Sequence, residues 1–372
     1  MPKKGNDILF LNLYSFSLTG GIEKVCKNFI DVLHDLFGDK GWHSLSLYDY
    51  TKDIDKGKLK AKTVKGFNNN KLLFFINSLL IGIKTNTIIL SHINLLLIAK
   101  VISLLKPNNR ILLFAHGIEV WGELSKWKVD FLNKKAEIWA VSNFTKQILI
   151  DKQGILKNKI VVLNNSLEPN LTLPSDFSKP LSLLKKYQLE KDYPVIYTLT
   201  RISSNEKYKG YDNVIKALGK LKKEGKYYHY LIAGKSDTLE KKRLENLIAE
   251  NDLNDEVKLL GYIDENELND HFLLSDVFAM PSKGEGFGIV FIEAAAHGCQ
   301  VIAGDKDGST DALLNGKLGQ LVDPDDVDAI AVAIEHAVAN KNHHPKLQQQ
   351  LTIENFGFET YKSKVAQLLT AN

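Results

Sequence analysis

The stretch from Glu285 to Glu293 places two carboxylates around a glycine-containing turn and the start of an apolar segment. Gly286 and Gly288 would open a helix after the strand-like run at 277–280. A helix N-terminus presents free backbone N–H groups and the positive end of a dipole, which suits an anion such as a phosphate. A carboxylate before the glycines can accept hydrogen bonds from hydroxyl groups. A nucleotide sugar combines an anionic phosphate group with the hydroxyl groups of a sugar, so we expect a ligand of that class.

Glu293 lies inside the apolar run 289–296, four residues after Ile289 and on the same helix face. A carboxylate embedded in such a run is costly unless it has a partner, and ribose hydroxyls would provide one. The plainer interpretation makes Glu285 and Glu293 ordinary surface charges on a helix.

Arg201 and Lys209 flank a polar loop that ends at Gly210, before a helix expected from Tyr211. A diphosphate leaving group gains negative charge as its bond to the sugar breaks, and two fixed cations would stabilise that charge without a metal. Arginine supplies a planar fork and lysine a point charge. The alternative is that both are solvated surface cations near a helix start.

Weaker signals lie in the first part of the chain. Gly20 and Gly21 lack a Cβ and would let a loop approach a ligand closely, although most such pairs mark only a tight turn. His116 could bond to a sugar hydroxyl or a phosphate, or be structural, and His92 is a weaker candidate that packing would explain. Trp121 and Trp127 would line an acceptor surface or simply pack.

Strand-like and helical runs alternate along the chain, which predicts parallel sheets covered on both faces. A proline-containing stretch from 168 to 180 interrupts the alternation and looks like a linker. Each motif falls where a strand ends, the edge at which ligands bind in such sheets. The expected strands are 8–13, 87–90, 110–114, 137–141, 160–163, 195–199, 230–233, 257–260, 277–280 and 300–303, and the expected helices are 22–36, 211–224, 238–250, 266–274 and 288–297.

Length and composition limit the remaining possibilities. A chain of 372 residues exceeds the size at which one core stops growing, so two domains are expected. A net charge of +4 is too small to indicate nucleic acid. Cys26 and Cys299 fit two buried reduced thiols, and no Cys/His spacing suggests a metal. No apolar run reaches the roughly 18 to 20 residues that cross a bilayer, so we expect a cytoplasmic protein, either soluble or peripheral.

The segment from Lys52 to Lys71 carries seven lysines and two aspartates. A solvated loop is the simpler interpretation. The alternative is a patch that contacts anionic lipid headgroups on the inner face of the membrane or a lipid-phosphate acceptor.

Taken together, these motifs resemble the retaining, nucleotide-sugar-dependent glycosyltransferases of family 4, which have the two-domain GT-B fold. The specific core of the resemblance is Arg201, Lys209-Gly210 and the Glu285-x7-Glu293 motif, in the order that the family shows. It implies two doubly wound Rossmann-like domains facing a central cleft. We expect an acceptor-side domain at 1–170, a linker at 171–190, a donor domain at 191–354, and a C-terminal helix at 355–372 that packs back on the first domain.

The resemblance also implies roles for individual residues. Arg201 and Lys209 would clamp the donor diphosphate, Glu285 would contact the sugar hydroxyls, and His116 would lie near the sugar. Glu293 would bind the ribose. The other donor contacts that the resemblance implies are Gly20, Gly21, Gly234, Tyr262, Ile263, Gly286, Phe287, Gly288 and Ile289.

Two loops depart from the family pattern. Where the family often has a Gly-Gly pair followed by Glu, this chain has the run 306–311, with Asp311 in the place of the Glu. Where the family often shows Gly-x-Gly, this chain has Gly234-Lys235-Ser236. Donor contacts from these two loops, and with them the identity of the donor, are left open.

The resemblance implies transfer of a sugar from a nucleoside diphosphate sugar, by default a UDP-sugar, to an acceptor hydroxyl with retention at the anomeric carbon. The reaction would be metal-independent and front-face, with the leaving phosphate oxygen taking the acceptor proton. The acceptor would be a saccharide or lipid-linked saccharide in cell-surface polysaccharide or glycolipid synthesis. The alternatives are a GT-B-fold nucleotide-sugar 2-epimerase and a non-catalytic nucleotide-sugar-binding subunit.

Overall fold

The computed structural model describes residues 8–54, 63–190 and 192–370. Its contacts divide the chain into two units, the first made of Met1–Pro169 with Gly357–Asn372 and the second of Asn170–Phe356. Residues 171–190, where we expected a linker, lie in the second unit in this division and contain the helix α8 (Leu181–Lys186). Just beyond α8, the Tyr187 hydroxyl and His271 Nε2 are 2.7 Å apart.

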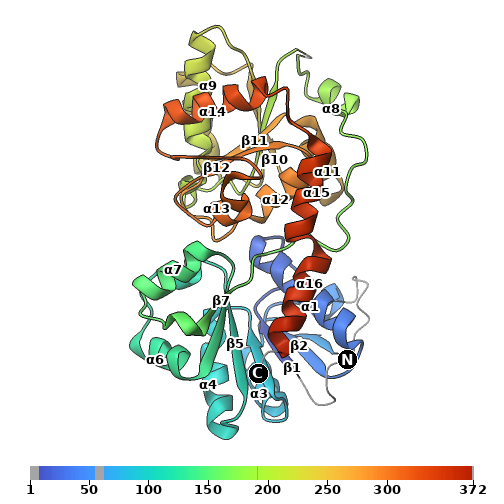
Figure 1. Ribbon diagram of the computed structural model, residues 1–372, viewed down its shortest axis with the longest axis vertical. Helices are drawn as coiled ribbons and strands as arrows, with labels where there is room; N and C mark the ends of the chain where they lie inside the picture. Colours follow the sequence, from blue (N-terminus) through green and yellow to red (C-terminus); the bar gives the residue numbers. More distant parts are fainter. Residues whose placement is uncertain (1–7, 55–62, 191, 371–372) are drawn as a thin grey trace. The chain divides into compact units, whose positions relative to one another are not determined.

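The first unit is built on a seven-stranded sheet in the order β3-β2-β1-β4-β5-β6-β7 (Figure 1). Every neighbouring pair is parallel. The strands are β1 (Ile8–Asn12), β2 (Trp42–Ser46), β3 (Val64–Gly66), β4 (Thr87–Leu90), β5 (Arg110–Ala115), β6 (Ala136–Ala140) and β7 (Ile160–Val162).

Helices cover both faces of this sheet because successive strand residues point to opposite sides. Leu9 and Leu11 pack in one core cluster with residues of α3, α4 and α7. On the other face, Phe10 packs edge-on against Phe29 of α1 at 4.9 Å. The helices are α1 (Gly21–Phe37), α2 (Thr51–Ile54), α3 (Lys71–Gly82), α4 (Leu96–Leu105), α5 (Ile118–Trp121), α6 (Lys126–Lys135) and α7 (Asn143–Asp151), with 3₁₀ helices η1 (Ile93–Leu95) and η2 (Lys157–Lys159).

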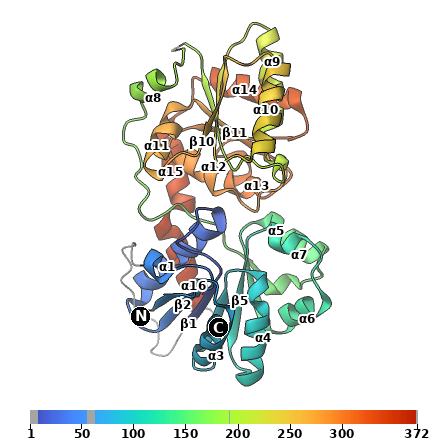
Figure 2. The ribbon, with the colours of Figure 1, turned by 180° about the vertical axis from the view of Figure 1, so that it is seen from behind.

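The C-terminal helix α16 (Phe358–Thr370) belongs to the first unit and lies beside α1 (Figures 1 and 2). The Arg110 guanidinium donates to the carbonyls of Leu368 and Leu369 at 2.9 and 3.2 Å. Lys362 forms an ion pair with Asp35 of α1 at 3.0 Å. A segment from the end of the chain therefore completes the unit that the start of the chain begins.

The second unit contains a six-stranded parallel sheet in the order β10-β9-β8-β11-β12-β13. The prediction of two doubly wound α/β domains is confirmed by the two sheets. The strands are β8 (Val195–Leu199), β9 (His229–Ala233), β10 (Val257–Gly261), β11 (Val277–Met280), β12 (Gln300–Gly304) and β13 (Gln320–Val322).

One face of this sheet packs against α9, α10 and α14 in a single apolar cluster. On the other face, Phe278 makes edge contacts with Tyr197 and with Phe291 of α12, both at 6.0 Å. The helices are α9 (Tyr211–Lys223), α10 (Thr238–Glu250), α11 (Glu265–Leu274), α12 (Ile289–Ala296), α13 (Ser309–Ala312), α14 (Val327–Ala339) and α15 (Pro345–Phe356), with 3₁₀ helices η3 (Lys207–Lys209) and η4 (Leu314–Gly316).

Candidate functional site

The candidate site of the second unit lies along one edge of its sheet. Arg201 follows β8, Gly234 follows β9, Tyr262 follows β10 and Glu285 follows β11. Because these strands are parallel, their carboxyl ends lie at the same edge. The structure thus brings together loops that are far apart in the sequence.

Lys209 and Glu285 form the polar centre of this edge. The Lys209 ammonium is hydrogen-bonded to Glu285 Oε1, and the two side chains are only 13% and 15% exposed. The ammonium also lies over the Tyr208 ring, 5.1 Å from its centroid. Burial alone would lower the pKa of Lys209, yet the neighbouring Glu285 carboxylate, with smaller contributions from Tyr208 and Glu206, raises that pKa above its ordinary value. Lys209 is therefore a fixed cation at neutral pH.

Arg201 is held less firmly than Lys209. Its side chain is 74% exposed, and its guanidinium pairs with Glu206 Oε1 at 2.7 Å. The two predicted cations are thus each paired with a glutamate of the same unit. A diphosphate could attract both cations by competing with those glutamates.

The loop that carries Lys209 rests directly on the turn before Glu285. Gly210 has a φ of +84°, and a Cβ there would lie 2.0 Å from the carbonyl oxygen of Pro281. Lys283 N donates to the Tyr208 carbonyl at 2.8 Å. Glycine at position 210 is therefore required both by its backbone conformation and by this close approach.

Asp307 holds the Glu285 turn in place and was not predicted as a site residue. Its Oδ2 accepts hydrogen bonds from Ser282 Oγ at 2.8 Å and from Glu285 N at 2.7 Å. Its Oδ1 accepts from Ser309 N at 2.9 Å. The side chain is 1% exposed, and burial raises its pKa against the lowering effect of these hydrogen bonds. The loop that departs from the family pattern therefore positions the central carboxylate.

The adjacent glycine makes this arrangement possible. A Cβ at Gly308 would lie 2.0 Å from the Gly286 carbonyl oxygen. The Gly308 N–H also donates to the Glu285 carbonyl at 2.8 Å. The Asp307-Gly308 pair was visible in the sequence, but nothing local indicated that its carboxylate is buried.

Helix α12 starts immediately after the Glu285 turn, with Gly288 in the left-handed region at φ +84°. Among the described residues, no hydrogen bond acceptor is found for the backbone N–H groups of Phe287, Gly288 and Ile289. The Phe287 side chain is buried against Phe356, so only its backbone is available. Glu293 lies one turn along α12 and is 6% exposed. Within the described part of the chain, the helix start thus presents backbone N–H groups without acceptors, and binding of a phosphate there, or of a ribose by Glu293, stays a prediction.

The third loop of this edge contains Gly234, whose φ is +136°. A Cβ at this position would lie 1.7 Å from the Thr200 carbonyl, so the loop passes very close to the end of β8. Tyr262 is 50% exposed, with the Lys235 ammonium 5.1 Å from its ring centroid. Ile263 is 7% exposed. Tyr262 is accessible for stacking on a base, whereas Ile263 mainly packs.

In the first unit, a buried carboxylate also organises a loop. Asp49 is inaccessible to solvent and accepts hydrogen bonds from Ser15 N at 2.8 Å, Ser17 N at 3.0 Å and Ser46 Oγ at 2.7 Å. These contacts fix the segment after β1 that leads to Gly20. Sequence reasoning did not find Asp49, because only tertiary structure shows its burial.

Gly20 and Gly21 lie where α1 begins. A Cβ at Gly20 would meet only the movable Glu23 carboxylate, and one at Gly21 would meet nothing within 4 Å. Neither glycine has a positive φ. The folded chain by itself therefore does not require glycine at these two positions.

His116 follows β5 and is buried, with its Nε2 2.8 Å from the Ser91 carbonyl oxygen. Burial lowers its pKa to about 4, so the ring is neutral at pH 7 and donates its Nε2 proton to Ser91. Within the described part of the chain, Nδ1 has no hydrogen-bond partner. His116 thus offers an unused acceptor at the carboxyl end of its strand.

The remaining candidates of the first unit have structural partners. His92 caps η1 by accepting from Asn94 N at 3.1 Å. Trp121 packs edge-on against Phe144 at 5.4 Å, and Trp127 lies under the Lys100 ammonium at 4.8 Å. Cys26, like Cys299 of the second unit, is a buried free thiol, as expected.

An apolar recess of about 310 Å³ opens beside β1 and β2 at the start of α3. No sequence motif indicated it. It is lined by Leu13, Leu47, Tyr48, Lys71, Phe74, Phe75, Asn94, Leu95 and Ile98.

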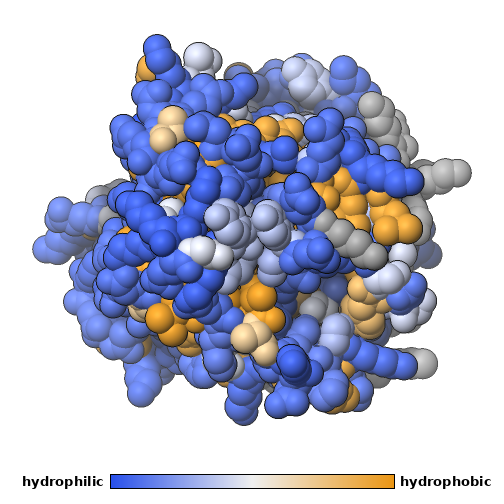
Figure 3. Space-filling view, turned by 90° about the horizontal axis from the view of Figure 1, so that it is seen from above, coloured by the Kyte–Doolittle hydropathy of each residue, from blue (hydrophilic) through white to orange (hydrophobic). Residues whose placement is uncertain are grey.

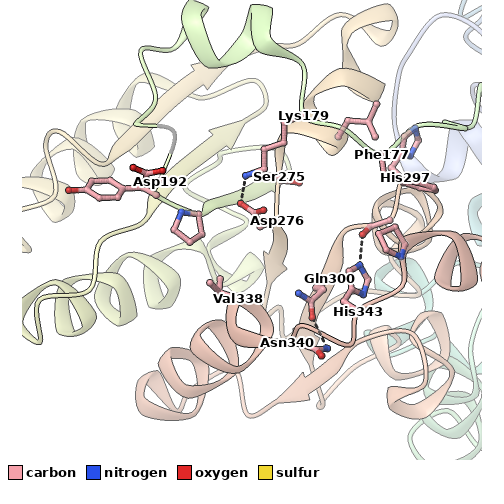
Figure 4. A pocket seen from close by; sticks show the side chains of 15 residues that line it. Phe177, Lys179, Asp192, Ser275, Asp276, His297, Gln300, Val338, Asn340 and His343 are labelled. Atoms are coloured by element: carbon pink, nitrogen blue, oxygen red, sulfur yellow. Dashed lines mark hydrogen bonds and ion pairs between the residues drawn. The ribbon is translucent and has the colours of Figure 1, made fainter.

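A second recess, of about 440 Å³, lies at the opposite edge of the second sheet from the candidate site (Figure 4). Asp276 and Gln300 at the amino ends of β11 and β12 line it. Lys179 is bonded to Asp276, and His343 Nε2 lies 2.7 Å from the Gly298 carbonyl oxygen. Because Lys179 and His343 already have partners in the unit, we do not place the predicted site in this recess.

Residues 182–353 match the protein family described as "Glycosyl transferases group 1". The match covers less than half of the chain, so it is a similarity of this region. The matched region contains Arg201, Lys209, Glu285 and Glu293, and it covers nearly all of the second unit.

Two solved structures show that the similarity of fold extends beyond the matched region. A glycosyltransferase from Rickettsia africae is 21% identical, with a TM-score of 0.79 over 99% of this chain and 98% of that one. Anabaena Alr3699/HepE in complex with UDP and glucose is 20% identical, with a TM-score of 0.78 over 98% and 99% of the chains. The predicted GT-B fold is confirmed by this similarity.

Curated relatives are more similar in sequence, but their alignments cover a shorter part of the chain. The GDP-mannose-dependent alpha-(1-6)-phosphatidylinositol monomannoside mannosyltransferase of Mycolicibacterium smegmatis is 31% identical over 189 residues, 48% of each chain. The capsular polysaccharide biosynthesis glycosyltransferase CapM of Staphylococcus aureus is 28% identical over 199 residues, 50% of this chain and 51% of that one. The chain thus spans about half the length of these curated relatives.

Proposed function

We propose that this protein transfers a sugar from a nucleoside diphosphate sugar to an acceptor hydroxyl, with retention of anomeric configuration. The observation that carries this proposal is the partly buried Lys209–Glu285 pair beside the free N-terminus of α12. The pair supplies a fixed cation for a diphosphate and a carboxylate for sugar hydroxyls. The N-terminus of α12 supplies backbone N–H donors for the diphosphate or the sugar. The match of residues 182–353 to the group 1 glycosyl transferases supports the same reaction.

In this proposal Lys209 and Arg201 stabilise the charge that develops on the diphosphate as the glycosidic bond breaks. Glu285 orients the sugar through its hydroxyls, Glu293 binds the ribose, and the neutral His116 accepts a hydrogen bond from a hydroxyl. No side chain serves as a nucleophile. The leaving phosphate oxygen takes the proton of the incoming hydroxyl on the same face, so positioning and electrostatics supply the catalysis.

The identities of the donor and of the acceptor are further parts of the proposal. We propose a UDP-sugar as donor, without a metal, and GDP-mannose is the alternative because three relatives carry that donor in their names. We propose a saccharide or lipid-linked saccharide as acceptor, in polysaccharide or glycolipid synthesis on the cytoplasmic side of a membrane. The apolar recess of the first unit favours a lipid-linked molecule.

A thermal-shift comparison of UDP, GDP and ADP tests the donor, because a ligand that binds only the folded state raises its stability. We expect one of the three to raise the unfolding temperature in the presence of EDTA. Labelled donor incubated without acceptor then distinguishes transfer from 2-epimerisation, because an epimerase would convert the donor alone. Tight donor binding with no transfer to any acceptor would indicate a non-catalytic subunit.

The Arg201→Ala variant tests the diphosphate clamp. Loss of one fixed cation should reduce turnover on the order of 100- to 1000-fold. Lys241→Ala is the matched control, because Lys241 is a cation of the same unit with a 54% exposed side chain. Turnover of Arg201→Ala close to that of the control would show that the clamp is assigned to the wrong residue.

A further inference from the structure

The outer side of α3 is apolar although it faces solvent. Phe74, Ser78 and Gly82 form the buried side of this helix. On the opposite side, Leu72, Ile76, Leu80 and the following Ile83 are 68%, 41%, 55% and 39% exposed. Their spacings of four, four and three residues place them in one stripe along the helix. A helix that is apolar on all sides is normally covered by something.

Helix α4 adds a second exposed stripe next to the first. Leu97, Leu104 and Leu105 are 56%, 74% and 64% exposed. Figure 2 shows α3 and α4 side by side, and a Cβ at Gly82 would lie 2.5 Å from the Ile102 side chain, so the two helices pack closely. We call the exposed residues the α3/α4 surface; they are Leu72, Leu73, Ile76, Leu80, Ile83, Leu97, Leu104 and Leu105.

This surface differs from an ordinary water-facing one. The face in Figure 3 shows the common pattern, in which hydrophilic residues separate small hydrophobic areas. Contiguous apolar area on one side of a unit marks an interaction site. At 12 residues, α3 is about 18 Å long and too short to cross a hydrocarbon layer of roughly 30 Å. Within the described residues, no helix is long and apolar enough to span a membrane.

The part of the chain that forms this surface carries charged residues of one sign. Residues 56–118 contain no aspartate or glutamate, although the whole chain has 44 of them. Five lysines of this stretch lie within or next to α3 and α4 in the described residues: Lys65, Lys71, Lys84, Lys100 and Lys106. Two copies of this surface would repel each other, whereas an anionic bilayer would attract it.

We propose that the α3/α4 surface docks on a bilayer that contains anionic lipids, with the leucine and isoleucine side chains in the interface and the lysines at the headgroups. This mode of binding combines buried apolar area with electrostatic attraction. It refines the sequence hypothesis of a lysine patch at 52–71, in which Lys56, Lys58, Lys60 and Lys62 lie outside the described residues. The proposal does not depend on the reaction assigned above. It would bring the recess beside Phe74 to the membrane surface.

Sedimentation of the full chain with vesicles tests this docking. We expect binding to vesicles of equal parts phosphatidylcholine and phosphatidylglycerol, weaker binding at high salt, and little binding to phosphatidylcholine alone. The triple variant Leu72→Ser, Ile76→Ser, Leu80→Ser should lose at least about tenfold in affinity, since three apolar side chains leave the interface. Circular dichroism and the nucleotide thermal shift establish that the variant is folded.

A matched control removes equally exposed apolar residues from the second unit. The variant Leu239→Ser, Val332→Ser, Leu347→Ser changes side chains that are 78%, 63% and 62% exposed, and it should bind vesicles like the wild type. The proposal is overturned if the wild type ignores anionic vesicles or if both triple variants bind equally. It is also overturned if light scattering shows a wild-type dimer that the α3 triple variant alone converts to a monomer.

Discussion

Because Lys209 is paired with Glu285, we expect a substitution of Glu285 to change diphosphate binding and catalytic turnover in opposite directions. In the ligand-free protein the Lys209 ammonium is bonded to Glu285, so an arriving diphosphate must share it. Glu285→Gln removes the competing negative charge and keeps the shape of the side chain. We therefore expect tighter binding of UDP, or of whichever diphosphate the thermal shift selects. Turnover should fall, because the carboxylate no longer orients the sugar.

The size of the effect follows from the geometry. Two unit charges about 4 Å apart interact by about 4 kcal/mol at an effective dielectric constant of about 20. The pair is 13% and 15% exposed, so water does not fully screen it. The ammonium has three protons and can keep part of its contact with Glu285 when a phosphate arrives. If about one third of the interaction is lost on binding, the variant gains about 1.4 kcal/mol, or tenfold in affinity.

Calorimetric titration of the full chain with the nucleoside diphosphate measures this gain. Glu250→Gln is the control, because it removes the same charge from an exposed position at the end of α10. Lys209→Met should weaken binding instead. Unchanged or weaker binding by Glu285→Gln, with the control unaffected, would refute the idea that Glu285 competes with the diphosphate for Lys209.

Two further predictions concern buried groups. Asp307→Asn loses at least one of three hydrogen bonds to a buried carboxylate and should cost roughly 1.5–3 kcal/mol of stability; chemical unfolding should show no comparable loss for the exposed Asp305→Asn. Because the pKa of His116 is lowered to about 4, the stability that its neutral form provides is present above about 6.5 and lost as the pH falls toward 4. The stability difference between wild type and His116→Gln should therefore shrink between pH 7 and pH 4.5, and the exposed His43→Gln is the control for the loss of a histidine. A pH-independent difference would contradict the assigned burial.

Apolar runs in the sequence predicted most of the central strands. The runs at 87–90, 195–199 and 277–280 correspond residue for residue to β4, β8 and β11. Three strands were not predicted, namely β2, β3 and β13. β2 reads Trp-His-Ser-Leu-Ser, and β3 and β13 have three residues each, so none shows the apolar run that marks a buried strand.

The candidate site was less accessible to sequence reasoning. Lys209, Glu285 and Gly234 were predicted as site residues because charged residues and glycines after strands have a direct chemical meaning. Asp49 and Asp307 were not, because an aspartate in a loop is ordinary and only the folded chain shows that its carboxylate is buried. The pairing of Arg201 with Glu206 was also hidden, since it depends on the conformation of the loop between them.

The return of α16 to the first unit affects the timing of biosynthesis. On a ribosome, β1 to β7 emerge first, but the carbonyls that Arg110 binds and the lysine that pairs with Asp35 belong to residues 362–369. The whole stretch Asn170–Phe356 must be translated before they appear. At about 5–20 residues per second this takes on the order of ten to forty seconds. The unit that starts the chain is thus completed last, and during that interval its α1 surface is uncovered and open to chaperones.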